Sequence, residues 1–201
     1  MKPGPDHVPA GEVIGKDFFA RDTIEVARDL LGKVLVRDVA GSSRIWGRLV
    51  EVEAYLGPDD RAAHSFGGRR SPRNEVMYGV AGHAYVYLTY GMHHCLNFVT
   101  REAGLPQAVL VRALEPGPGV DRCGGPGLVC RALDIDRKLN GVPLAPPTLY
   151  VVDDGEPARR IFTTPRIGVE NSGDWAPRPL RFCWDSPHLS RPIPRALRAA
   201  D

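Results

Sequence analysis

Two carboxylates and a tyrosine alternate along one short stretch of the chain. In residues 50–56, which read VEVEAYL, Glu51, Glu53 and Tyr55 are spaced two apart. Because successive side chains of a β-strand point to opposite faces, all three are expected on one face. A partly buried carboxylate can act as a general base toward water. The spacing does not distinguish Glu51 from Glu53 as that base, and an acid on a strand is most often only a solvated charge.

A loop rich in glycine and arginine follows this strand. Residues 61–74, RAAHSFGGRRSPRN, contain His64 and the cluster Arg69, Arg70 and Arg73. A neutral imidazole can donate to or accept from the edge of a base. Glycines let a backbone approach a ligand closely, and arginines bind phosphate. We interpret the three arginines as phosphate contacts; a solvated basic loop is the alternative for the same residues.

Tyrosines recur in the segment AYVYLTY, residues 84–90. Tyr87 is expected on a strand face and Tyr90 at the tip of a hairpin. Strand tyrosines usually pack in the core or across strands. The functional interpretation is a stacking platform at Tyr87 and an exposed wedge at Tyr90, since wedges between base steps help to open a duplex. His93 and His94 border the wedge, but adjacent strand residues point to opposite faces, which argues against a metal site.

Strands and two helices must hold these residues in place. We expect a single α+β domain with a mainly antiparallel, curved β-sheet flanked by helices, spanning residues 12–190. Residues 1–11 are expected to be disordered and residues 191–201 to form a basic tail. Helices are predicted over residues 22–32 and 125–141. Strands are predicted over residues 33–39, 44–56, 84–90, 94–100, 107–116, 148–153, 159–169 and 179–185.

The composition is that of an ordinary globular protein, with 43% hydrophobic and 25% charged residues. The net charge of +2 neither requires nor excludes a polyanionic partner. No apolar run approaches the roughly 20 residues that span a bilayer, and the first residues lack the apolar region of a secretory signal, so we expect a cytoplasmic protein. Four scattered cysteines indicate reduced thiols.

Several catalytic motifs are absent. The chain has no GxxxxGK[ST], GxGxxG, GxSxG or HExxH pattern, which removes the usual signatures of P-loop, Rossmann, serine-hydrolase and zincin chemistry. No lysine occurs between Lys33 and Lys138, so a Schiff-base nucleophile within this central block is excluded. A carboxylate remains the best candidate catalyst.

Several long segments resemble one enzyme family in the same order along the chain. They are EVEAYLGPDDRAAHSFGGRRSPRN, YVYLTYGMHHCLNFV, VLVRALEP, GPGLVCRALDID and PRIGVENSGDW. Together they are similar to the alkyladenine (3-methyladenine) DNA glycosylases over most of residues 12–187. The resemblance implies a monomeric, monofunctional glycosylase without metal or cofactor, located in the cytoplasm with the nucleoid. Its substrate would be double-stranded DNA that contains alkylated or deaminated purines, such as 3-methyladenine, 7-methylguanine, hypoxanthine or ethenoadenine. The enzyme would flip the purine out, hydrolyse its N-glycosidic bond and leave an abasic site for base excision repair.

The resemblance also implies roles for individual residues. Glu53, not Glu51, matches the catalytic glutamate, and Arg112 matches an arginine beside the catalytic water. The residues that match the base pocket are Tyr55, His64, Tyr87 and Asn97, of which the asparagine disfavours normal guanine. Tyr90 matches the residue that fills the gap left in the duplex. Two other functions fit the residues less well: a nucleic-acid-binding module without catalysis, and an N-glycosidase for free nucleosides, which would have little use for Tyr90 or the arginine loop.

Overall fold

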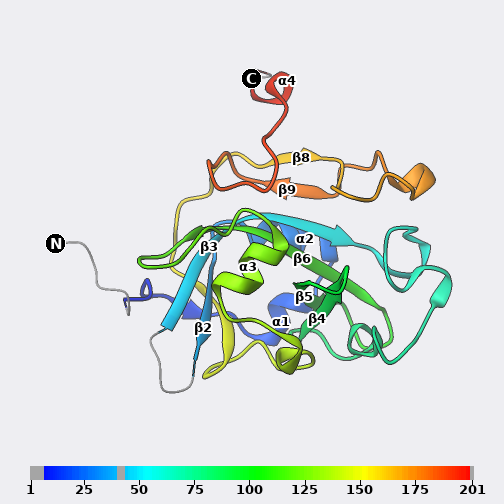
Figure 1. Ribbon diagram of the computed structural model, residues 1–201, viewed down its shortest axis with the longest axis horizontal. Coiled ribbons are helices and arrows are strands. Elements are labelled where there is room, and N and C mark those ends of the chain that lie inside the picture. Colours follow the sequence, from blue (N-terminus) through cyan, green and yellow to red (C-terminus); the bar gives the residue numbers. More distant parts are fainter. Residues whose placement is uncertain (1–6, 40–43, 200–201) are drawn as a thin grey trace.

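The computed structural model describes residues 7–39 and 44–199, and in this part of the chain nine strands join into one sheet (Figure 1). Neighbouring strands pair antiparallel. The main path runs β1-β7-β2-β3-β6-β5-β4, while β9 pairs with β3 and β8 pairs with β9. The bounds are β1 Glu12–Val13, β2 Val34–Asp38, β3 Arg44–Tyr55, β4 Ala84–Thr89, β5 His93–Thr100, β6 Gln107–Pro116, β7 Leu149–Asp153, β8 Phe162–Thr164 and β9 Arg181–Cys183.

Four helices accompany the sheet in the described residues. They are α1 Lys16–Phe19, α2 Thr23–Asp29, α3 Pro126–Ala132 and α4 Arg195–Arg198. Helix α2 contacts β3 and β6, and α3 contacts β5 and β6, whereas α4 stands apart beyond β8 and β9 (Figure 1). The predicted α+β fold with a mainly antiparallel sheet is therefore confirmed.

Strand β3 is the longest strand and changes its partner part-way along. On one edge, residues 44–48 pair with β2 and residues 51–53 pair with β9, while β6 pairs along the other edge. The register with β6 shifts on both sides of Glu51, as at a β-bulge. Strands therefore flank β3 on both edges at Glu51 and Glu53, and both side chains are completely buried.

The main hydrophobic core lies between the sheet and helices α2 and α3. Helix α2 begins as predicted, because the Asp22 carboxylate accepts hydrogen bonds from the Ile24 and Glu25 amides at 2.9 and 3.3 Å. The chain then turns at Gly32, which has a φ of +88° and lies against the Trp184 ring. A Cβ at Gly32 would stand 2.1 Å from that ring, so the turn requires glycine.

Three predicted elements are much longer than the elements observed, and one of them is the strand predicted over residues 179–185, of which only Arg181–Cys183 forms β9. The helix predicted over residues 125–141 ends at Ala132, because Asp134 adopts a left-handed φ of 49° and Asp136 caps a separate 3-10 turn at Arg137–Leu139. The strand predicted over residues 159–169 is reduced to β8, which ends before Pro165, a residue that cannot donate to a sheet ladder.

The two ends of the chain differ in structure: the N-terminal segment is irregular, whereas the C-terminal segment packs against the sheet and includes a short helix. Residues 1–6 of the predicted disordered segment lie outside the described residues, and residues 7–11 have neither helix nor strand. In the predicted basic tail, Ile193 is buried against Phe162 and Cys183, and α4 follows it. Residues 200–201 lie outside the described part of the chain.

Candidate active site

The Glu53 carboxylate sits at the centre of a small hydrogen-bond network. Its Oε1 accepts a bond from the Ile167 amide at 2.8 Å. Its Oε2 accepts bonds from the Arg112 guanidinium at 3.1 Å and from the Tyr55 hydroxyl at 3.0 Å. Complete burial raises the pKa of Glu53 above its ordinary value, although Arg112 and the Ile167 amide act in the opposite direction.

The Glu51 carboxylate is bound more tightly. Its Oε1 accepts from Arg181 at 2.8 Å, from Arg112 at 3.1 Å and from the Ser190 hydroxyl at 2.6 Å. Its Oε2 accepts from the Ser190 amide at 2.6 Å. Burial by itself raises the pKa of Glu51. The hydrogen bond and charge of Arg181, together with Ser190 and Arg112, lower this pKa by more than burial raises it, so the net shift is downward.

The two carboxylates differ in the number of donors that bind them. An ionised carboxylate offers about four lone-pair sites on its two oxygens. Four donors occupy Glu51, whereas three occupy Glu53. Oε1 of Glu53 and Oε2 of Glu51 each accept one hydrogen bond and can each take a further donor such as water. Glu53 nevertheless has one donor fewer and a raised pKa, and its partner Tyr55 lines the cavity described below. The alternation of the sequence left the choice between the two glutamates open, and these differences favour Glu53.

Arg112 from β6 links both carboxylates. Its Nε donates to Glu51 and its Nη1 donates to Glu53. Burial lowers the pKa of the Arg112 guanidinium, but the charges of Glu53 and Glu51 raise it by more, so the side chain remains a cation. With Arg181, the cluster pairs two carboxylates with two guanidiniums, which is how buried charges are tolerated.

A cavity of about 160 Å³ lies beside this cluster and brings together all four predicted base-pocket residues. Its walls are Tyr55, Ala62, His64, Met77, Tyr85, Tyr87, Asn97, Ala108, Gly168 and Val169. Glu53 does not line the cavity. Tyr55 does, and its hydroxyl donates the hydrogen bond that links the cavity wall to the Glu53 carboxylate. Asn97 donates from Nδ2 to the Tyr85 carbonyl at 3.1 Å, which fixes the orientation of its amide.

His64 is a neutral histidine packed between two tyrosines. Its Nδ1 forms a 2.8 Å hydrogen bond with the Tyr85 hydroxyl, and its ring meets the Tyr87 ring edge-on with centroids 4.5 Å apart. Burial, followed by the charges of Arg73 and Arg69, lowers the pKa of His64 to about 4. At neutral pH the imidazole therefore carries one proton and can both donate and accept.

Tyr90 occupies the tip of the hairpin between β4 and β5. Its side chain is 90% exposed, and its backbone adopts a φ of 50°, which is unusual for a tyrosine. Gly91 follows with a φ of 68°, and the Met92 amide closes the turn on the Thr89 carbonyl at 3.1 Å. The turn thus holds the large ring out into solvent.

The three arginines of the loop are not equivalent. Arg70 forms a bidentate ion pair with Glu75, at 2.9 and 2.5 Å. Arg73 donates to the Leu88 carbonyl at 3.2 Å and lies 5.4 Å from the centroid of the Tyr87 ring. Arg69 is exposed. The charge of Arg70 is already balanced, so Arg69 and Arg73 are better placed to meet an external anion.

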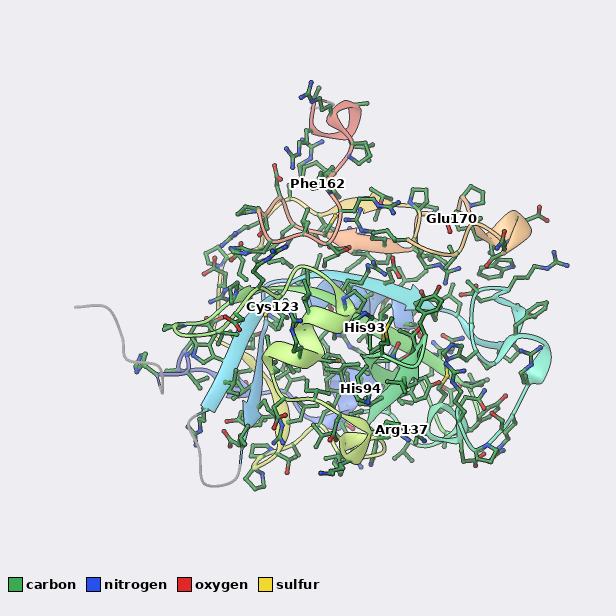
Figure 2. The ribbon with its side chains drawn as sticks, in the orientation of Figure 1. His93, His94, Cys123, Arg137, Phe162 and Glu170 are labelled. Carbon is green, nitrogen blue, oxygen red and sulfur yellow. The ribbon has the colours of Figure 1, made fainter. Side chains whose placement is uncertain are left out.

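A larger cavity of about 640 Å³ lies between the hairpin and α3, beside Tyr90. His93 and His94 both line it, and Figure 2 shows them below the layer that carries Phe162 and Glu170. It contains none of the four predicted base-pocket residues, so its size does not make it the candidate site. In the described residues, no cluster of three or more His, Cys, Asp or Glu side chains could hold a metal ion.

Comparison with known proteins identifies the family. A family model described as methylpurine-DNA glycosylase (MPG) matches residues 17–187. A relative from Desulfitobacterium hafniense is 44% identical over 190 residues, which cover 84% of this chain and 93% of the relative. Relatives from Anaeromyxobacter dehalogenans and Methanocella arvoryzae are 50% and 45% identical over 90% of this chain, covering 87% and 98% of their own lengths. All three carry the name of a candidate 3-methyladenine DNA glycosylase.

The chain belongs to the methylpurine-DNA glycosylase family. The predicted resemblance to the alkyladenine glycosylases is confirmed, and so is the prediction of a DNA glycosylase enzyme. Membership makes DNA the substrate of this methylpurine-DNA glycosylase. Within residues 7–39 and 44–199, no helix combines the length and apolar character needed to cross a bilayer.

Sequence reasoning missed several residues that complete the glycosylase site. Tyr85 binds His64 and lines the cavity; its shared strand face with Tyr87 could have revealed it. Ile167, Arg181 and Ser190 supply donors to the two glutamates from more than 100 residues away. No local pattern signals these three, because each acts through a contact that only the folded chain creates.

Proposed function

We propose that this methylpurine-DNA glycosylase hydrolyses the N-glycosidic bond of damaged purines that are flipped out of duplex DNA, with Glu53 as general base. The observation that carries the proposal is the position of the Glu53 carboxylate beside an aromatic cavity: Tyr55, which lines the cavity, donates to Oε2, and Oε1 has an acceptor site left beside the Ile167 amide. Proton transfer to a positioned carboxylate requires such a site within hydrogen-bond reach of the proton. The raised pKa of Glu53, caused by burial, makes the carboxylate a stronger base than a solvated one.

The cavity supports binding of an extruded base. A duplex shields C1′ of each nucleotide, so the base must leave the stack at a cost of a few kcal/mol. Stacking on Tyr55 and Tyr87 offsets part of this cost, and neutral His64 offers a hydrogen-bonding group at the cavity wall. Asn97, which lines the cavity, is the proposed residue that disfavours normal guanine. We assign 3-methyladenine, 7-methylguanine, hypoxanthine and ethenoadenine as candidate bases.

The reaction follows from the charges around Glu53. Glu53 takes a proton from water, the water oxygen attacks C1′, and the bond between C1′ and the purine nitrogen breaks. The buried carboxylates stabilise the positive charge that develops on the sugar, and Arg112 holds Glu53 in position. Among the described residues, no lysine lines the cavity, which supports a monofunctional enzyme that leaves an intact abasic site.

The surface around the cavity supports a duplex as the partner. Tyr90 is the proposed wedge that fills the gap left by the flipped nucleotide. Arg69, Arg70 and Arg73 are the proposed phosphate contacts, and Arg70 must first separate from Glu75. We expect the enzyme to act as a monomer on chromosomal DNA in the cytoplasm, as part of base excision repair.

Base release from duplex oligonucleotides tests the proposal. Each duplex carries one lesion, and each reaction is divided into a portion treated with hot alkali and an untreated portion. Release of the base with strand cleavage only after alkali would support a monofunctional glycosylase. Cleavage without alkali would contradict it. Tight binding to lesion DNA with no release from any duplex would indicate a damage-binding module instead.

A further inference from the structure

Two of the three tyrosine rings of the base cavity, Tyr55 and Tyr87, have an arginine over one face. The Arg166 guanidinium carbon lies 4.6 Å from the centroid of the Tyr55 ring, and that of Arg73 lies 5.4 Å from the centroid of the Tyr87 ring. Both distances fall within the roughly 6 Å of a cation–π contact. Arg166 does not line the base cavity. It lines a separate cavity of about 310 Å³. The Tyr55 ring therefore lies against the Arg166 cation and also lines the space for the base.

Arg166 is fixed in this position. Its Nη1 and Nη2 donate to the Asp60 carboxylate at 2.5 and 2.8 Å, and Nη1 also donates to the Ala54 carbonyl at 2.9 Å. Asp60 in turn accepts from the Leu56 and Ala62 amides. The Arg166 and Asp60 side chains are completely buried, so water cannot screen the cation. Arg73 differs, because it is exposed.

The cation acts on the electronics of the Tyr55 ring. Burial and the Glu53 carboxylate raise the pKa of the Tyr55 hydroxyl, and the Arg166 charge works against them. The faces of an aromatic ring are electron-rich, and a cation on one face draws electron density toward itself. A second cation on the opposite face then gains less attraction from the ring, while Asp60 balances the direct repulsion between the two cations. A neutral base keeps its stacking and dispersion contacts.

We propose that Arg166 is a specificity-determining residue that makes the Tyr55 wall of the cavity favour neutral damaged purines over cationic ones. This inference rests on the proposed function and deepens it by naming the charge class of the base. Hypoxanthine represents the neutral class and 7-methylguanine the cationic class. Arg166 acts through Tyr55 and does not touch the base.

The test compares single-turnover release of hypoxanthine and 7-methylguanine from duplexes of one sequence, in wild type and in Asp60→Asn/Arg166→Gln. The double change removes the buried cation together with its counter-charge, and circular dichroism confirms the fold. We expect the ratio of the two efficiencies to shift toward 7-methylguanine by about three- to tenfold, the range of a partly desolvated cation–π contact. A general structural defect would slow both reactions and leave the ratio unchanged.

Two further variants complete the test. Arg166→Lys keeps a charge opposite Asp60 but removes the planar guanidinium from the ring, so we expect an intermediate ratio, and this variant decides the matter if the double variant does not fold. Arg73→Gln is the matched control behind Tyr87, where exposure and salt screening make the expected shift smaller. A wild-type ratio in every folded Arg166 variant would overturn the inference.

Failure of the proposed function would give a different result. Wild type that releases neither base would overturn the glycosylase reaction but not the inference. The ratio is then measured as equilibrium binding to the two lesion duplexes, because stacking on Tyr55 requires no catalysis. An unchanged binding ratio in the Arg166 variants would overturn the role of Arg166 independently.

Discussion

Glu51 and Glu53 make an unusually well-matched pair for separating structure from chemistry. They lie two residues apart on β3, both are completely buried, and both bind Arg112. We expect Glu53→Gln to reduce single-turnover base release by roughly 10²–10⁴-fold, the contribution of a positioned general base. We expect Glu51→Gln to retain release within about tenfold of wild type, since the cavity-lining Tyr55 binds Glu53 and not Glu51.

The stability of the two variants should run in the opposite order. Glu51→Gln takes the charged acceptor from Arg181, Arg112 and Ser190, and breaking a buried ion pair costs about 3–5 kcal/mol. Glu53→Gln leaves Arg112 paired with Glu51. The loss of unfolding free energy should therefore be roughly 1–3 kcal/mol, the cost of one imperfect buried hydrogen bond. For a chain of this length, 1 kcal/mol shifts Tm by about 2–4 °C, so the difference is measurable.

Thermal unfolding followed by circular dichroism gives the stability order, and alkali-dependent strand cleavage gives the rates below the lower Tm. Lesion binding is measured in parallel, and Glu53→Gln should still bind. Equal loss of base release in folded Glu51→Gln and Glu53→Gln would refute the assignment of Glu53, and not Glu51, as the general base. Loss of lesion binding in Glu53→Gln would point to a structural role for that residue.

Three further predictions concern pH, the wedge and the arginine loop. Because Glu53 must be ionised and burial raises its pKa, single-turnover release should fall on acidification at a pH above the ordinary glutamate value; an acid limb at or below that value would contradict the assignment. Tyr90→Ala should slow release most from fully paired sites and least from mismatched ones, and equal rates to wild type on paired duplexes would remove the wedge role. Replacing Arg69 and Arg73 by Gln should flatten the salt dependence of DNA binding by about one unit of slope per lost phosphate contact. Arg70→Gln should change the slope less, because Glu75 already balances Arg70. A wild-type slope for the double variant would mean that the loop faces solvent.

The elements of this fold were predictable to the extent that local patterns determine them. The alternation of side-chain types in residues 50–56 located β3. The Asp22 cap located the start of α2. Helical spacing failed over residues 125–141, where Asp134 turns into the left-handed region and side-chain capping by Asp136 starts a new turn. Spacing of apolar residues carries no information about such a break.

The candidate site was predictable in its types of residue but not in its connections. The spacing of Glu51, Glu53 and Tyr55 indicated a shared face, and the resemblance singled out Glu53. The sets of donors that separate the two glutamates include the Ile167 and Ser190 amides, which reach β3 across 114 and 139 residues. Packing of distant segments creates those bonds, so the sequence near β3 could not reveal them.

These long-range donors have a consequence for when the enzyme becomes active during its synthesis. β3 is made early, but the Ile167 amide, Arg181 and Ser190 that hold its two carboxylates belong to the last part of the described chain. Domains fold as units while the chain emerges at about 5–20 residues per second. A nascent chain that has completed the aromatic cavity walls up to Ala108 still lacks the amide that orients Glu53. On the proposed mechanism, the site is therefore complete only after the segment from Ile167 to Ser190 has emerged and docked against β3.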